Sequence, residues 1–311
     1  MKGKLMEKKF SSLVKNLFAN FTGVRKTNVF SSPRHKRLSV ETLESRQMLS
    51  VTPVAWDTVA SAFAAYEDKL INKDVTDFSL VDNVYWVMNS EEFNAALALA
   101  QESPDSDVIA FDRDFDGEKI ELAQTAGFTG LSGDIYIIGV NPDGENVDVT
   151  IDGSRVTRGF EFSEIIAGFY DVNIEKVNGT AIYASNAAID LQNVTISDSA
   201  SSAIYADSGN QITISGFSKF TGNSAAYGGA IYASQSSLTI TDTEFSGNTA
   251  SFGGAVYVTD STVKLENALF ENNTALFGGG ILAIETNLQL LSTDENNPTT
   301  FTGNTATQYG G

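Results

Sequence analysis

Asp242 and Glu244 are the carboxylates whose type and spacing could support catalysis. They lie two residues apart, so on an extended strand both side chains would point to the same face. Glycoside hydrolysis needs two such positioned carboxyl groups. The matching residues 25 positions later are Asn267 and Leu269, and the sequence pattern offers the pair no basic neighbour. A catalytic pair competes here with two solvated carboxylates near a turn, and we favour the solvated carboxylates because Asp and Glu are mostly exposed.

A second candidate site is an oxygen-rich loop that could bind calcium. Asp112, Asp114 and Asp116 alternate in DRDFDG, and Gly117 takes the sixth position, as a calcium-binding loop requires. The twelfth position is Ala123, where such a loop carries a bidentate glutamate. A plain Asp/Gly turn between strands is the competing interpretation, and we favour it.

Four tyrosines recur at the same step of short alternating segments: Tyr183, Tyr205, Tyr232 and Tyr257. Because side chains alternate along a strand, Tyr232 should point outward if Ile231 points inward. A row of exposed rings could stack on the faces of sugars, which would make glycans partners of this chain. A half-buried sheet surface is the alternative, and the preference of aromatic residues for strands favours it.

Composition excludes several other chemistries. The 311 residues contain no Cys, which excludes thiol nucleophiles, thiolate metal sites and disulfides. The single histidine, His35, stands in the basic run PRHKR, so no Ser-His-Asp triad or multi-histidine zinc site is available. No run of about 18 apolar residues occurs, so we expect no transmembrane span.

Charge divides the chain into two parts. Residues 1–50 hold 11 of the 20 Lys and Arg but 3 of the 39 Asp and Glu, a net charge of +8 that leaves −27 for residues 51–311. The acidic part argues against nucleic acid and anionic lipid as partners, because both reward Lys and Arg. The basic part has apolar residues at helical spacing from Phe10 to Phe21, flanked by lysines. We therefore predict a basic export or targeting segment over 1–50, with a disordered basic tail as the alternative.

The end of this segment carries a resemblance. LESRQMLS, from Leu43 to Ser50, resembles the Leu-Glu-Pro-Arg-x-Leu-Leu-Ser segment near the start of many large extracellular proteins of planctomycete-type bacteria. Ser45 replaces the proline and Met48 replaces a leucine. The resemblance implies a secreted or cell-surface (extracellular) protein.

The elements that must position the candidate residues begin after this segment. We predict a partly helical linker and cap over 51–104, from the helical spacing between Trp56 and Leu70 and from NSEEFNAALALA. In the latter, Asn89 or Ser90 before two glutamates is typical of a helix start. Short β-rich segments separated by Gly, Asp or Pro turns follow, so strands should fill 105–311.

A repeat dominates the second half of the chain. A Phe and an Asn three residues later recur at 25-, 25- and 31-residue steps, and a Gly pair keeps the same phase, which is typical of a solenoid. We expect the Phe rings to stack inside, the Asn amides to form a ladder at a positive-φ turn and the Gly pairs to allow a tight corner. The repeat residues are Phe220, Asn223, Gly228, Gly229, Phe245, Asn248, Gly253, Gly254, Phe270, Asn273, Gly278, Gly279, Phe301 and Asn304.

These words resemble the GGAI and FxxN repeats of the chlamydial polymorphic outer-membrane proteins and, more broadly, right-handed parallel β-helix proteins. Residues 228–231 (GGAI) and 220–223 (FTGN) fit exactly, and the resemblance covers residues 220–311. It implies an extracellular or surface-displayed β-helix, often adhesive. Nothing in the chain resembles the membrane-embedded C-terminal barrel of that family.

We therefore predict an all-β fold, a right-handed parallel β-helix (solenoid) over 105–311 with a short helical N-terminal cap and its clearest repeats at 220–311. The expected function is non-catalytic, adhesin-like or structural, with glycans or surface and matrix components as partners. The alternative is a carbohydrate-active enzyme, a polysaccharide lyase or glycoside hydrolase, on the same scaffold. Because the sequence stops within a repeat at Gly311, we also expect a truncated product that self-associates through its open end.

Overall fold

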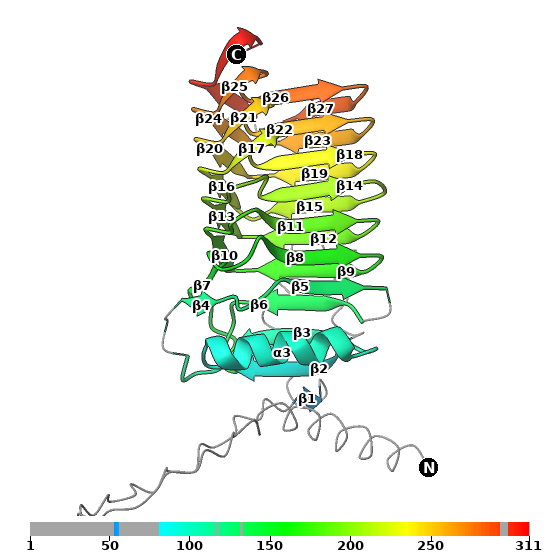
Figure 1. Cartoon of the computed structure of the whole chain (residues 1–311), viewed down its shortest axis with the longest axis vertical. Coiled ribbons are helices and arrows are strands. Elements are labelled where there is room, and N and C mark those ends of the chain that lie inside the picture. Colours follow the sequence, from blue (N-terminus) through cyan, green and yellow to red (C-terminus); the bar gives the residue numbers. More distant parts are fainter. Residues whose placement is uncertain are drawn as a thin grey trace, which may run out of the picture. The chain divides into compact units, whose positions relative to one another are not determined.

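The computed structural model describes residues 53–55, 81–115, 117, 119–130, 133–292 and 298–310. The predicted export segment at 1–50 and the helical pattern between Trp56 and Leu70 lie outside the described residues. Within them, short parallel strands stack coil on coil along one axis (Figure 1). The all-β solenoid predicted from the sequence is confirmed, and a short helix lies near its N-terminal end in the part of the chain that the structure describes.

The longest sheet has ten strands, and all its pairings are parallel except that of β1 with β2. Parallel pairing already starts with β2, within the region predicted to be linker and cap. In sheet order the strands are β1 (Val54–Ala55), β2 (Val81–Val87), β3 (Ser106–Phe111), β6 (Ile135–Ile138), β9 (Ile166–Tyr170), β12 (Ala188–Gln192), β15 (Gln211–Ser215), β19 (Ser237–Thr241), β23 (Thr262–Glu266) and β27 (Asn287–Leu291).

Two further long sheets form other sides of the coils. The eight-stranded sheet contains β4 (Ile120–Glu121), β7 (Val149–Asp152), β10 (Val172–Glu175), β13 (Thr195–Ser197), β16 (Lys219–Thr221), β20 (Glu244–Ser246), β24 (Leu269–Glu271) and β28 (Thr300–Thr302). The seven-stranded sheet contains β5 (Ala126–Thr129), β8 (Arg158–Ser163), β11 (Thr180–Ser185), β14 (Ile204–Asp207), β18 (Ile231–Ser234), β22 (Val256–Thr259) and β26 (Ile281–Ile284).

A fourth sheet appears only in the coils that carry the repeated words. Its strands are β17 (Ser224–Tyr227), β21 (Thr249–Phe252), β25 (Thr274–Phe277) and β29 (Thr305–Tyr309). Each of the first three ends just before a Gly pair. Gly228 has φ +54°, and a Cβ on Gly229 would lie 2.5 Å from the carbonyl oxygen of Gly254. The first glycine therefore supplies a left-handed conformation and the second allows neighbouring backbones to approach, so the fourth side can turn into the next strand.

The helix α3 (Ser90–Glu102) lies against the N-terminal end of the stack (Figure 1). The Asn89 side chain caps it by accepting a hydrogen bond from the Glu92 backbone N–H at 3.0 Å, and the Glu92 carboxylate accepts one from the Met88 N–H at 2.8 Å. This reciprocal capping satisfies donors that a helix start leaves free. Phe93 of α3 stacks on Phe111 with ring centroids 6.2 Å apart, so the helix covers apolar surface at this end.

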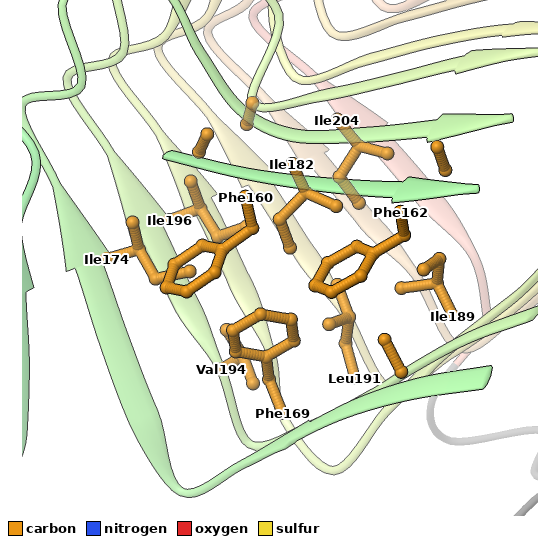
Figure 2. Close-up of a cluster of buried hydrophobic side chains, with 14 of the residues drawn as sticks. Phe160, Phe162, Phe169, Ile174, Ile182, Ile189, Leu191, Val194, Ile196 and Ile204 are labelled. Atoms are coloured by element: carbon orange, nitrogen blue, oxygen red, sulfur yellow. The ribbon is translucent and has the colours of Figure 1, made fainter. Parts of the chain in front are cut away.

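Stacked apolar side chains fill the interior. Phe245 lies between Phe220 and Phe270, with centroid distances of 5.1 and 4.7 Å, and all three rings are fully buried. In the coils before the repeated words, the interior is built from other residues, among them Phe160, Phe162 and Phe169 (Figure 2). The inward-facing positions are therefore apolar along the whole stack, including the coils that lack the repeated FxxN and GGAI sequences.

The repeated asparagines are buried inside the coil, and they do not adopt the positive φ predicted from the sequence. The positive-φ position is the residue just before each of them, for example Gly222, Gly247 or Asn272. Asn248 donates through Nδ2 to the Phe220 carbonyl at 2.8 Å and to Asn273 Oδ1 at 3.0 Å. Adjacent residues therefore have different roles at this corner. The residue with positive φ turns the backbone, and the asparagine after it hydrogen-bonds to the neighbouring coils.

Burial of each coil depends on the coil that follows it. Phe270 is fully buried, whereas Phe301 at the same position of the last described coil is 47% exposed. Leu265 and Leu290 differ in the same way, at 0% and 56%. The two residues of each pair are register partners on adjacent parallel strands. Their exposed fractions differ because the following coil covers Phe270 and Leu265, whereas no described coil covers Phe301 and Leu290.

We predict that Phe245→Ala lowers the free energy of unfolding by about 3–5 kcal/mol, because it removes a buried ring from the middle of the stack. Asn248→Ala should cost about 3 kcal/mol, because it removes the side-chain acceptor of the buried Asn223 N–H and the side-chain donor to the Phe220 carbonyl, both in the preceding coil. Chemical denaturation followed by far-UV circular dichroism measures both. The exposed neighbour Thr249→Ala is the control, with an expected change below about 0.5 kcal/mol. Neutral results for both buried positions would contradict the interior assignment.

Candidate functional site

The four tyrosines predicted as a ladder form one outward row, called here the tyrosine face: Tyr183, Tyr205, Tyr232 and Tyr257, on β11, β14, β18 and β22. Successive rings are stacked, with centroids 5.7, 4.4 and 5.7 Å apart. Each ring is half-buried while its neighbour Ile or Val on the strand points inward. One ring per coil follows from the parallel register, because identical positions lie above one another.

Burial and hydrogen bonding favour the neutral form of three of these tyrosines, Tyr183, Tyr205 and Tyr257, by raising the pKa of each. The Tyr183 hydroxyl donates to Asp207 at 2.5 Å, and this bond raises the pKa of Tyr183 to about 12. Burial, with a smaller contribution from neighbouring Tyr232, raises the pKa of Tyr205 and of Tyr257. The face is therefore uncharged at neutral pH and carries hydroxyl groups along its edge.

A polar pocket of about 490 Å³ lies at the N-terminal end of the tyrosine face. Arg158 covers the Tyr183 ring, with its guanidinium carbon 4.6 Å from the ring centroid, and pairs with Glu161 at 2.6 Å. Asp207 lines the same pocket from the next coil. At this end of the tyrosine face, one pocket therefore combines aromatic rings, hydroxyl groups, a positive charge on Arg158 and a negative charge on Asp207.

A second aromatic row, which the sequence reasoning did not single out, runs beside the tyrosine face on the fourth sheet: Tyr227, Phe252, Phe277 and Tyr309. Its rings stack at 5.1, 5.2 and 5.8 Å. Tyr227 meets Tyr232 and Tyr257 edge to face, at 6.3 and 5.2 Å. The available signal was the aromatic residue just before the glycines in YGG, FGG, FGG and YGG. The two rows meet because the Gly pair turns the chain sharply between them.

Asp242 and Glu244 do not share a strand face. Asp242 has φ +49° and forms the corner between β19 and β20, whereas Glu244 begins β20. Asn267, at the same corner of the next coil, donates to Asp242 at 3.1 Å. The expectation that the pair has no basic neighbour is wrong, because Lys219 is the register partner of Glu244 and its Nζ lies 3.5 Å from the carboxylate.

The predicted calcium loop is a turn in the residues that can be described. The Asp112 carboxylate accepts from the Asp114 N–H at 3.3 Å, and the Phe115 N–H bonds to the Asp112 carbonyl. Phe115 packs on Phe111, with ring centroids 5.0 Å apart. The third candidate, Asp116, lies outside the described residues. Among those described, no cluster of three or more His, Asp or Glu side chains is arranged to hold a metal ion.

The stacked coils, their parallel register and the outward aromatic rows define a parallel β-solenoid with two elongated rows of aromatic rings on its surface. The family model for the right handed beta helix region matches residues 140–311, more than half of the chain, and the chain belongs to that family. Comparison with curated proteins and with solved structures gave no match. In the part of the chain that the structure describes, no helix has the length and apolar character needed to cross a membrane.

The hydrogen bond from Tyr183 to Asp207 predicts that Tyr183 ionises at a higher pH than an ordinary tyrosine. Because the folded-state pKa of Tyr183 is above its ordinary value of 10.0, the stabilisation that its hydrogen bond provides is complete below pH 10 and is lost as pH rises through about 12. Asp207→Asn should move this ionisation towards the ordinary value, as measured by ultraviolet tyrosinate absorbance. Tyr183→Phe identifies the signal by removing it. Superimposable titrations of wild type and Asp207→Asn would contradict the assignment.

Proposed function

We propose that this chain is a non-catalytic, adhesin-like β-helix protein of the cell surface or extracellular space that binds glycan chains along its tyrosine face. The observation that carries the proposal is the row of four stacked, half-exposed rings, one in each of four successive coils. Because neighbouring rings cover one another's faces, the row presents ring edges and hydroxyl groups, and the hydroxyl groups can hydrogen-bond to sugar hydroxyls.

The spacing of the rings favours an extended glycan over a single sugar. Neighbouring centroids are 4.4 to 5.7 Å apart, a step comparable to the length of one sugar residue in a linear chain. A polysaccharide running along the solenoid axis could therefore meet one ring per sugar. Each contact would be weak, but several contacts on one chain raise the effective concentration of the next. This arrangement suits adhesion to a polymeric surface.

The alternative function is a carbohydrate-active enzyme. One observation favours it, because Asp242, Glu244 and Lys219 line a common surface pocket. Against it, Glu244 is paired with Lys219, and Asp242 accepts a hydrogen bond from Asn267. Two carboxyl groups engaged in this way are less suited to serve as acid and base than free ones. We therefore rank adhesion first.

The location rests on the basic segment and the motif at its end. Residues 1–50 carry +8 and residues 51–311 carry −27, and the resemblance to an export segment lies at their junction. The GGAI and FxxN words support surface display by their likeness to the polymorphic outer-membrane protein repeats. Self-association of the β-helix stays a prediction.

We expect residues 1–55, fused to a fluorescent reporter, to export it from a planctomycete-type host. The physical reason is the charge change at Leu43–Ser50, which separates the basic segment from the acidic body. Cell fractionation measures the outcome. A fusion in which Lys8, Lys9 and Lys15 are changed to Glu is the matched control and should stay inside. A reporter that remains wholly cytoplasmic in both fusions would contradict the proposed extracellular location.

Replacing Tyr232 and Tyr257 together by Ser should weaken binding to glycan arrays or insoluble polysaccharide by roughly tenfold, since the exposed ring edges and phenolic hydroxyls of two coils are lost while the backbone ladder remains. Circular dichroism checks that the fold is kept. Leu99→Ala on α3 removes an exposed apolar side chain elsewhere and should not alter binding. Equal binding by the double variant would contradict the tyrosine face as the contact surface. Polysaccharide cleavage that disappears in Asp242→Asn would instead establish the enzyme alternative.

A further inference from the structure

The corner between β15 and β16 is one residue longer than the matching corners of the coils before and after it. Two residues separate Gln192 from Thr195, and two separate Thr241 from Glu244. Three residues, Gly216 to Ser218, separate Ser215 from Lys219. The flanking strands keep their register on both sides, so the extra residue is accommodated wholly within the corner.

The insertion places an aromatic ring in solvent. Phe217 is 74% exposed, although the other corners use Asn, Asp, Gly or a polar residue. Its backbone has φ +64°, next to Gly216 at +69°. A bulky side chain in this region is disfavoured, and glycine would fit without strain. Folding alone gives no reason for phenylalanine at this position, because its ring contributes little to the core.

Phe217 shares a surface pocket with polar groups from three coils. It lines a surface pocket of about 290 Å³, and the other lining residues are Lys219, Asp242, Thr243, Glu244, Asn267 and Leu269. Asn267 donates through Nδ2 to Asp242, while its own Oδ1 is buried and accepts no hydrogen bond from the described residues. The pocket wall therefore combines acceptors, one ammonium donor and an aromatic surface.

This combination distinguishes between classes of ligand. A cationic ligand would meet a favourable net charge, but Glu244 is already paired with Lys219, which leaves Asp242 as the one carboxylate not in an ion pair. An anionic ligand would meet two carboxylates and a lysine already paired with Glu244, so the net charge of these groups is unfavourable. A neutral sugar fits, since its hydroxyls both donate and accept and its C–H face packs on an aromatic ring.

We propose that the Phe217 pocket is a binding site for a neutral saccharide, separate from the tyrosine face. The Phe217 ring stacks on one sugar, while Asp242 and Glu244 accept from its hydroxyls and Lys219 donates to one. The pocket lies at the corner between the ten-stranded and eight-stranded sheets, whereas the tyrosine face belongs to the seven-stranded sheet. The proposal does not require the tyrosine face to bind anything.

A fluorine label at the proposed contact can report binding at this pocket alone. In the full chain, 4-fluorophenylalanine is incorporated at position 217, and its fluorine NMR signal is followed during titration. The neutral probes are cellohexaose, maltohexaose, mannohexaose and xylohexaose, and the charged probes are hexagalacturonate and hexalysine. We expect a saturable shift with at least one neutral probe and a weaker one or none with either charged probe.

Phe217→Gly separates function from folding. Glycine fits the positive φ, so the melting temperature should stay the same or rise, while affinity for the neutral probe in calorimetry falls roughly 3- to 10-fold. Phe217→Tyr keeps the aromatic surface and should keep affinity. The Tyr232→Ser and Tyr257→Ser double variant should leave the shift at position 217 unchanged, whatever happens at the tyrosine face.

Three results would overturn the proposal: no shift with any neutral probe, a larger shift with hexagalacturonate or hexalysine, or unchanged affinity in Phe217→Gly. Preferential binding of hexalysine would mean that the pocket recognises cationic peptide segments. Preferential binding of hexagalacturonate would mean that it recognises acidic sugars. Either outcome would leave the proposed role of the tyrosine face to be decided by its own variants.

Discussion

Each buried asparagine bonds to the coil before it and the coil after it, and the regularity of the later coils depends on this ladder. Asn248 accepts from the backbone and side chain of Asn223 and donates to Asn273, so three coils are fixed by one side chain. With the corner fixed at this point, the preceding Phe strands must lie directly above one another. The same register determines which positions face outward, and the tyrosine rows follow from it.

The period of the repeat was sufficient to predict the solenoid, because a Phe, an Asn and a Gly pair in constant phase leave few other ways to bury the rings. The sequence was less informative about corners. The positive-φ residue could be Gly, Asn or Asp, so the buried asparagine next to it was mistaken for the turn residue. The earlier coils keep the same fold with Ile174 and Ile196 at the register position of the repeated Phe, and only the alternation of apolar and polar residues could have indicated it.

Contacts between coils were the hardest part of the candidate site to predict. Lys219 and Glu244 are 25 residues apart, and they become neighbours only because parallel register places them at one level of the sheet. Asp242 and Glu244 are close in sequence, yet the positive φ of Asp242 places the two residues on different elements. To predict the second aromatic row, one would have to know that the residue before each Gly pair lies at the end of a strand. In a solenoid, a separation of a few residues is therefore a weak predictor of which side chains are neighbours, and a separation of one coil is a strong predictor.

The direction of the hydrogen bonds has a mechanical consequence. Strands run across the solenoid, so the bonds that join one coil to the next point along its axis. A pulling force along that axis acts on all the junctions between coils in series, but a terminal coil has a neighbour on one side only, so the coils would peel off one after another from an end. Each released coil of 25 residues adds about 80 Å of extended chain. A tether built this way lengthens in steps and absorbs work at each step, so a load is released gradually before the whole molecule unfolds.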